Sequence, residues 1–137
     1  MAQLESLYRY QYRWKDFEDL SVRVIEMRNR VLGQEHPDTL TSMANLAFTY
    51  RNQGHWEKAE ALLLQVLGTR KRVVGPKHPH TLTSMANLAN AWEAQGSIDE
   101  AIVLMSQVAT LRSSTLGENH PDTKRSVQTL AQWESSV

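Results

Sequence analysis

The stretch TLTSMANLA occurs twice in this chain, at residues 39–47 and again, unchanged, at residues 81–89. The copies are 42 residues apart, and the same spacing relates three His-Pro pairs and three glycines. These are His36-Pro37, His78-Pro79 and His120-Pro121, together with Gly33, Gly75 and Gly117. Such a period indicates one supersecondary unit repeated in tandem, whose copies bury their apolar faces by stacking on one another. The period therefore favours a surface that holds a partner over a pocket for chemistry.

Composition narrows the class of protein. The 137 residues are 41% hydrophobic and 22% charged, which is typical of a soluble chain with one core. Lys plus Arg equals Asp plus Glu, at 15 each, whereas non-specific nucleic-acid binders carry a basic excess. The chain has no cysteine, no apolar run of the roughly 18 residues that a membrane helix needs, and no signal-peptide pattern at residues 1–6. We expect a cytoplasmic protein that contacts neither nucleic acid nor membrane.

Charge is distributed unevenly between neighbouring units. Residues 36–77 hold six basic and three acidic side chains, whereas residues 78–119 hold one basic and four acidic side chains. The formal charges of the two units are therefore +3 and −3. This difference has two interpretations: drift between solvated faces, or attraction between units or between chains.

Each unit shows the apolar spacing of two helices. Residues 40–50 carry apolar side chains at spacings of three and four, and Gln53-Gly54 then interrupts the pattern. A second stripe runs from Trp56 to Val73, and the next unit repeats both stripes. Pro37 suits the first position of a helix, because its missing N–H would be unpaired there anyway. The small residues are expected where two helices approach closely, namely Ala47, Ala59, Ala89 and Ala101.

The predicted architecture is all-α, with about seven helices in one domain spanning residues 1–137. Its units are approximately 1–35, 36–77 and 78–119, followed by a lone terminal helix at 120–137. Residues 1–32 keep the apolar register, although Tyr12 stands where the turn glycine is expected. Short connections predict antiparallel neighbours. The four tryptophans are expected in the core, with a role as a ligand platform as the alternative.

Catalytic motifs are missing from the sequence. The three periodic histidines, one per unit, cannot converge on one metal along a stacked array, and we interpret His-Pro as a connector whose ring packs against or caps the next helix. There is no glycine-rich phosphate loop, no Gly-x-Ser-x-Gly and no His-Glu-x-x-His. We therefore expect neither enzyme activity, nor a metal, nor a cofactor.

The motif positions resemble the tetratricopeptide repeat. The first copy supplies Met43, Leu46-Ala47, Tyr50, Gly54, Trp56 and Ala59, and the second supplies Met85, Leu88-Ala89, Trp92, Gly96, Ile98 and Ala101. The usual repeat has about 34 residues, whereas the longer second helix and the Gly-x-x-His-Pro connector resemble the 42-residue kinesin light chain type. The pattern also resembles the repeat arrays at the C-terminal end of fungal receptor-like signalling NTPases.

This resemblance implies a right-handed superhelix, or α-solenoid, of antiparallel helix pairs. The first helix of each pair would line a concave groove that binds a peptide or protein partner. The implied partner-binding residues are Thr41, Asn45, Phe48, Arg51 and Asn52, then Thr83, Asn87, Asn90 and Glu93, and finally Arg125 and Gln128. Further positions on the same faces are Arg9, Tyr10, Ala44, Ala86, Ala94 and Gln132. Arg9 and Arg51 make one end of the groove basic, which favours an acidic peptide.

Two other classes of function stay open. The chain could be an assembly element of a larger signalling protein, because uncapped repeats expose apolar edges that favour self-association. An enzymatic role would require a fused domain that this chain does not contain.

Overall fold

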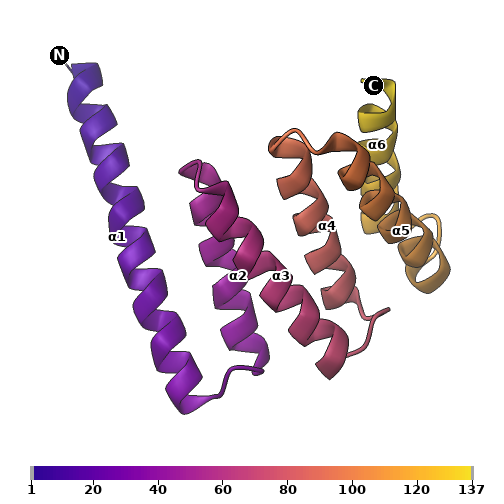
Figure 1. The fold of residues 1–137 in the computed structure, drawn as a ribbon, viewed down its shortest axis with the longest axis horizontal. Helices are drawn as coiled ribbons and strands as arrows, with labels where there is room; N and C mark the ends of the chain where they lie inside the picture. Colours follow the sequence, from indigo (N-terminus) through magenta and orange to yellow (C-terminus); the bar gives the residue numbers. More distant parts are fainter. Residues whose placement is uncertain (1, 137) are drawn as a thin grey trace. The chain divides into compact units, whose positions relative to one another are not determined.

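The computed structural model describes the backbone of residues 2–136 and, within that range, the side chains of residues 15, 16 and 18–136. All regular structure in this range is helical, which confirms the all-α class (Figure 1). The helices are α1 (Ala2–Val31), α2 (Pro37–Asn52), α3 (Trp56–Val73), α4 (Pro79–Ala94), α5 (Ile98–Leu116) and α6 (Pro121–Ser135).

The helix count is six over residues 2–136, one fewer than the approximate count from the sequence. The difference lies in α1, which runs unbroken for 30 residues where two helices were expected. The later pairs turn at Gly54 and Gly96, whose φ angles are +81° and +92°. A side chain with a Cβ rarely adopts such angles, so Tyr12 favours continuation of the helix over a turn.

The chain divides into two compact units, residues 1–62 and 63–137, with the boundary inside α3. In the first unit, α1 packs against α2. In the second unit, α5 packs against both α4 and α6, and these neighbours run in opposite directions (Figure 1). The single domain expected over residues 1–137 and the handedness of its superhelix stay predictions.

The His-Pro connectors cap the helices that follow them. In each of α2, α4 and α6 a proline is the first residue, and the preceding histidine has extended backbone angles. Nδ1 of His36 accepts a hydrogen bond from the backbone N–H of Asp38 at 3.1 Å. His78 and His120 repeat this contact at 3.0 and 3.1 Å. The imidazole therefore pairs one of the N–H groups that every helix start leaves free.

The core of each unit lies where its helices meet. Ala47 and Ala59 in the first unit are 1% and 0% exposed, and Ala89 and Ala101 in the second unit are both 0% exposed. Their burial agrees with the close approach expected from the sequence. Larger side chains complete the core, among them Leu40, Leu46, Leu82, Leu88 and Val108.

We predict that Leu88→Ala lowers the free energy of unfolding by about 2–5 kcal/mol, because Leu88 is only 2% exposed and truncation leaves a cavity. Urea denaturation followed by circular dichroism measures this loss. Leu64→Ala is the matched control, because Leu64 also lies on a helix but is 47% exposed. Equal losses for the two variants would contradict the position of the core.

A threonine early in α2, α4 and α6 marks a difference between the connectors. Thr39 Oγ1 donates to the Gly33 carbonyl at 2.9 Å, and Thr81 Oγ1 donates to the Gly75 carbonyl at 2.7 Å. Thr123 is 2% exposed, and its Oγ1 has no hydrogen-bond partner among the described residues. The third connector therefore leaves a buried hydroxyl unpaired, which costs free energy.

The backbone hydrogen bond of the connector glycine, six residues before each threonine, also distinguishes the third connector from the first two. The N–H of Gly33 and that of Gly75 bond to the carbonyl five residues earlier, at Arg28 and Arg70. The N–H of Gly117 bonds to the carbonyl four residues earlier, so α5 continues to Leu116.

We predict that Thr81→Val costs about 1 kcal/mol of stability, because it removes a hydrogen bond in a part-buried connector. Thr123→Val is expected to be neutral or stabilising, because it replaces an unpaired buried hydroxyl with a methyl group. The two residues occupy equivalent helix positions, so the change in helix propensity is shared. Thermal unfolding of both variants measures the difference, and an equal cost would refute this account of the third connector.

Candidate functional site

The predicted partner-binding residues of α2 form one outward stripe. Thr41, Asn45, Phe48 and Asn52 are all exposed, at helical spacings of four, three and four, and Arg51 beside them is half-buried. Phe48 is 58% exposed, which is high for a large apolar side chain. The buried side chains of α2 leave this stripe free for contact with a partner.

The corresponding residues of α4 are less accessible. Thr83 is exposed, but its Oγ1 donates to the Pro79 carbonyl at 3.0 Å. Asn87, Asn90 and Glu93 are half-buried, which leaves part of each side chain open to solvent. Contacts with a partner on α4 would therefore involve fewer atoms than contacts on α2.

The terminal helix α6 presents the remaining two predicted residues. Arg125 and Gln128 are exposed, and Arg125 Nη1 lies 3.6 Å from Asp122 Oδ1. The side chains of Arg9 and Tyr10 lie outside the described residues. A groove that combines α2, α4 and α6 stays a prediction, because α2 belongs to one compact unit and α4 and α6 to the other.

An arginine that sequence patterns did not single out links each long helix to the next helix start. Arg70 Nη1 donates to Ser84 Oγ at 2.7 Å and to the His80 carbonyl at 3.3 Å. Ser84 Oγ in turn donates to the same carbonyl at 3.1 Å. One guanidinium nitrogen thus joins the end of α3 to the first turn of α4.

The same link recurs once per 42 residues. Arg112 Nη1 donates to Ser126 Oγ at 2.6 Å and to the Asp122 carbonyl at 3.4 Å. Arg28 Nη1 donates to Ser42 Oγ and, at 2.9 Å, to the Asp38 carbonyl. We call these three contacts the arginine links. Their signal in the sequence is an arginine and a serine that both follow the 42-residue period.

Burial makes the arginine links consequential. Arg70 and Arg112 are 9% and 7% exposed, and loss of solvent lowers the pKa of each guanidinium from its ordinary value. For Arg112 the charge of Asp122 acts in the opposite direction and raises the pKa. A buried cation requires its hydrogen-bond acceptors, so the serine hydroxyls hold the links together.

We predict that Ser84→Ala destabilises the protein by about 1–3 kcal/mol, because the buried Arg70 loses an acceptor. Ser114→Ala is the matched control, because Ser114 lies on α5 and bonds only to the Leu111 carbonyl at an exposed site. Both changes alter helix propensity equally. If urea denaturation gave the two variants the same stability, the arginine links would contribute nothing.

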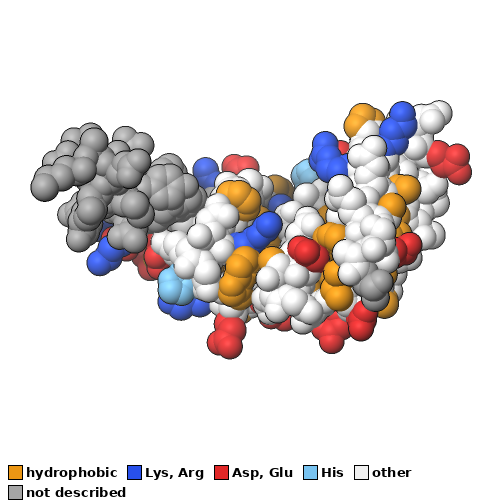
Figure 2. Space-filling view, turned by 90° about the horizontal axis from the view of Figure 1, so that it is seen from above, with side chains coloured by type: hydrophobic (Ala, Val, Ile, Leu, Met, Phe, Trp, Pro, Cys, Tyr) orange, Lys and Arg blue, Asp and Glu red, His pale blue; other side chains and the backbone are white. Residues whose placement is uncertain are grey.

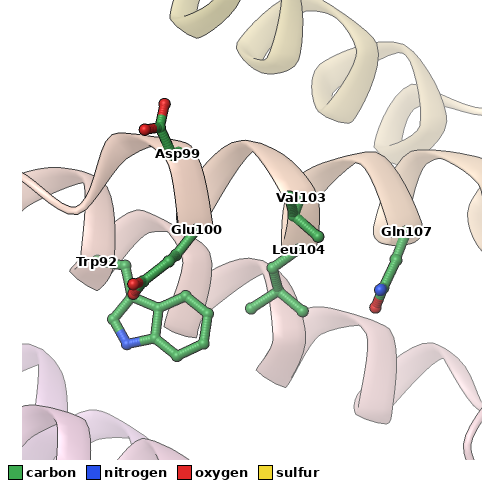
Figure 3. Close-up of a pocket in the computed structure, with 6 residues that line it drawn as sticks. All are labelled: Trp92, Asp99, Glu100, Val103, Leu104 and Gln107. Carbon is green, nitrogen blue, oxygen red and sulfur yellow. The ribbon is translucent and has the colours of Figure 1, made fainter.

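An open cavity of about 470 Å³ lies on α4 and α5, and sequence patterns did not predict it (Figure 3). Its lining residues are Trp92, Asp99, Glu100, Val103, Leu104 and Gln107. Figure 3 shows the indole of Trp92 below α5, with the Glu100 carboxylate beside it. Trp92 is half-buried, whereas Trp133 is 8% exposed and belongs to the core as expected.

A second open cavity, of about 450 Å³, is lined by residues of α5, α6 and their connector. It includes Gln128, which the sequence had placed on the partner-binding face, and Thr123 with its unpaired hydroxyl. Within the described residues, no three His, Asp or Glu side chains gather as a metal site would require. No helix in the described range is both long and apolar enough to cross a membrane.

Comparison with known proteins identifies relatives of this arrangement. Residues 6–38, 39–80 and 81–122 each match the family model of the tetratricopeptide repeat. Nearly identical TPR-like repeats of a Podosopora anserina protein assigned as a kinesin light chain are 30% identical, with a TM-score of 0.75 over 93% of this chain and 61% of that chain. A single-substitution variant of those repeats is also 30% identical, with a TM-score of 0.76 over 93% and 60%.

A more distant structure shares the fold alone. BtubC (BKLC) from P. vanneervenii is 16% identical and has a TM-score of 0.72 over 97% of this chain and 61% of that chain. The present chain therefore spans about three fifths of each of these solved chains. No curated protein matched it.

Proposed function

Because the chain belongs to the tetratricopeptide repeat family, whose repeats are generally protein-interaction modules, we propose that it binds a peptide segment of a partner protein. The proposed contact surfaces are the exposed stripe of α2 in the first unit and the exposed residues of α4 and α6 in the second. The proposal assigns the binding energy to surface contacts and not to chemistry. It also assigns the protein to the cytoplasm, in keeping with its cysteine-free sequence.

The exposed stripe on α2 is the observation that carries this proposal. Asn45 and Asn52 present amides that both donate and accept hydrogen bonds, which suits the backbone of an extended peptide. Phe48, 58% exposed between them, offers an apolar anchor. Aromatic side chains of this kind contribute a large share of the energy at protein interfaces.

Charge indicates which peptide residues each of these helices would favour. Arg51 on α2 is basic, whereas Glu93 on α4 is acidic. An acidic residue of the peptide is therefore favoured near α2 and disfavoured near Glu93. Exposed ion pairs contribute only about 0–1 kcal/mol each, so charge selects the register while the amides and Phe48 supply the affinity.

Self-association is a second candidate, supported by α1. Leu20, Met27 and Val31 are 59%, 61% and 76% exposed, at spacings of seven and four along one helix. A stripe of this kind on a protein surface favours contact with another apolar face. It would make the chain an assembly element of a larger signalling protein.

The test of partner binding uses the double variant Arg51→Glu, Asn52→Ala. Proteins captured by the wild-type chain are first identified, and the affinity of each is then measured by isothermal titration calorimetry. We expect about tenfold weaker binding to the variant, corresponding to about 1.4 kcal/mol. Lys71→Glu, Asn119→Ala is the matched control, because it also reverses a positive charge and removes an amide, at exposed residues outside α2.

Unchanged affinity of the double variant for every partner would refute the assignment of the groove. Light scattering across a concentration range then examines the second candidate. A strict monomer at high concentration would exclude self-association, whereas growth of the particle that Leu20→Ser, Met27→Ser abolishes would support it.

A further inference from the structure

Two equivalent positions in successive repeats differ in how an aromatic ring is covered. In the first of them, the Lys58 ammonium lies over the ring of Tyr50, with Nζ 5.5 Å from the ring centroid. Tyr50 belongs to α2 and Lys58 to the first turn of α3. A cation at this distance is attracted by the negative face of the ring. This chain therefore supplies its own cation to this aromatic side chain.

One repeat later the aromatic side chain is larger and the cation is replaced by an acid. Trp92 stands 42 residues after Tyr50, and Glu100 stands 42 residues after Lys58. Asp99 precedes Glu100, so two carboxylates occupy the turn of α5 that corresponds to the turn holding Lys58. Among aromatic residues, tryptophan attracts cations most strongly. The later repeat thus has the aromatic ring that binds cations more strongly, together with two negative charges.

The space above this platform is the open cavity of about 470 Å³ on α4 and α5. Trp92, Val103 and Leu104 provide apolar lining, and Val103 is 60% exposed. Asp99 and Glu100 are exposed and also line the cavity. Figure 2 shows acidic and apolar side chains next to each other over the part of the chain that holds α4–α6. The cavity therefore combines an aromatic ring, negative charge and accessible apolar surface.

We propose that this cavity binds a lysine or arginine side chain of a partner protein, together with an adjacent apolar residue of the same segment. The cation takes the place over Trp92 that Lys58 takes over Tyr50, with Asp99 and Glu100 as its counter-charges. The apolar neighbour contacts Val103 and Leu104. Charge complementarity favours this occupant, because residues 78–119 contain four acidic residues and a single basic one, Arg112, which is engaged in an arginine link.

This site differs in place and in chemistry from the peptide surface proposed above. It lies mainly on α5, whereas the proposed peptide surface uses α2, α4 and α6. It selects a cationic segment, whereas Arg51 favours an acidic one. The two sites can therefore be tested separately, and failure of one leaves the other standing.

The experiment is an NMR titration of the full chain with two matched probes. The first is the peptide acetyl-Arg-Leu-Leu-amide, and the second replaces its arginine with citrulline, which has the same shape and no charge. The indole N–H of Trp92 and the methyl groups of Val103 report occupancy. We expect the arginine peptide to bind roughly three- to tenfold more tightly than the citrulline peptide, from one cation–π contact and exposed ion pairs.

Three variants sharpen the experiment. Glu100→Lys restores the arrangement of the preceding repeat, so its own ammonium should cover Trp92 and abolish binding of the arginine peptide. Asp99→Asn, Glu100→Gln should remove most of the difference between the two peptides. Glu134→Gln is the matched control, because it removes an exposed acid of α6 outside the cavity, and it should leave that difference intact.

Equal binding of the two peptides to the wild-type chain would overturn the proposal, as would unchanged arginine-peptide binding to Glu100→Lys. Circular dichroism establishes that each variant is folded. If Glu100→Lys fails to fold, the neutral pair Asp99→Asn, Glu100→Gln decides, because these exposed changes preserve side-chain size. The variant Arg51→Glu, Asn52→Ala should bind the arginine peptide as the wild type does.

Discussion

The arginine links are the interaction on which the arrangement of the helices depends. A guanidinium group is planar and its N–H groups have fixed directions, so the two bonds from Arg70 Nη1 fix the first turn of α4 against the end of α3. Side chains further along α4 follow at helical spacing and inherit that orientation. The link also carries a cost, because a buried cation without its acceptors is unfavourable. The serine therefore matters for the position of α4, because it supplies one of those acceptors.

Local chemistry explains why much of the fold could be predicted from the sequence. Proline at the first helical position and glycine after the last one depend on the backbone of a few neighbouring residues. Pro79 accordingly begins α4, and Gly96 follows its end, where the pattern placed them. The buried alanines follow equally directly, because a helical period assigns each residue to a face. The exposed stripe on α2 consists of the residues that the same period places on the opposite face of the helix.

Other features depend on information that a pattern does not contain. One long helix and two helices joined by a turn have the same apolar register. The continuity of α1 therefore depends on Tyr12, which disfavours the positive φ angle that the turn requires. Arg70, Lys71 and Arg72 all suit the end of a helix as positive charges, yet only Arg70 is buried. Arg70 donates to Ser84, 14 residues away, and a local charge pattern does not contain this contact. Cavities are even harder to predict from a sequence, since their shape depends on how two helices pack.

Tandem copies nevertheless contain a comparison that a single sequence usually lacks. Where two copies share a scaffold, a position that reverses its charge cannot be explained by the scaffold alone. In the first copy, Lys58 stabilises its own repeat by covering Tyr50. In the second copy, Glu100 occupies the position of Lys58, and Trp92, which attracts cations more strongly than tyrosine, occupies the position of Tyr50. In the second copy the corresponding place is an open cavity lined by Trp92 and by the exposed carboxylates of Asp99 and Glu100. Those are the properties that a binding surface needs and a purely structural repeat does not.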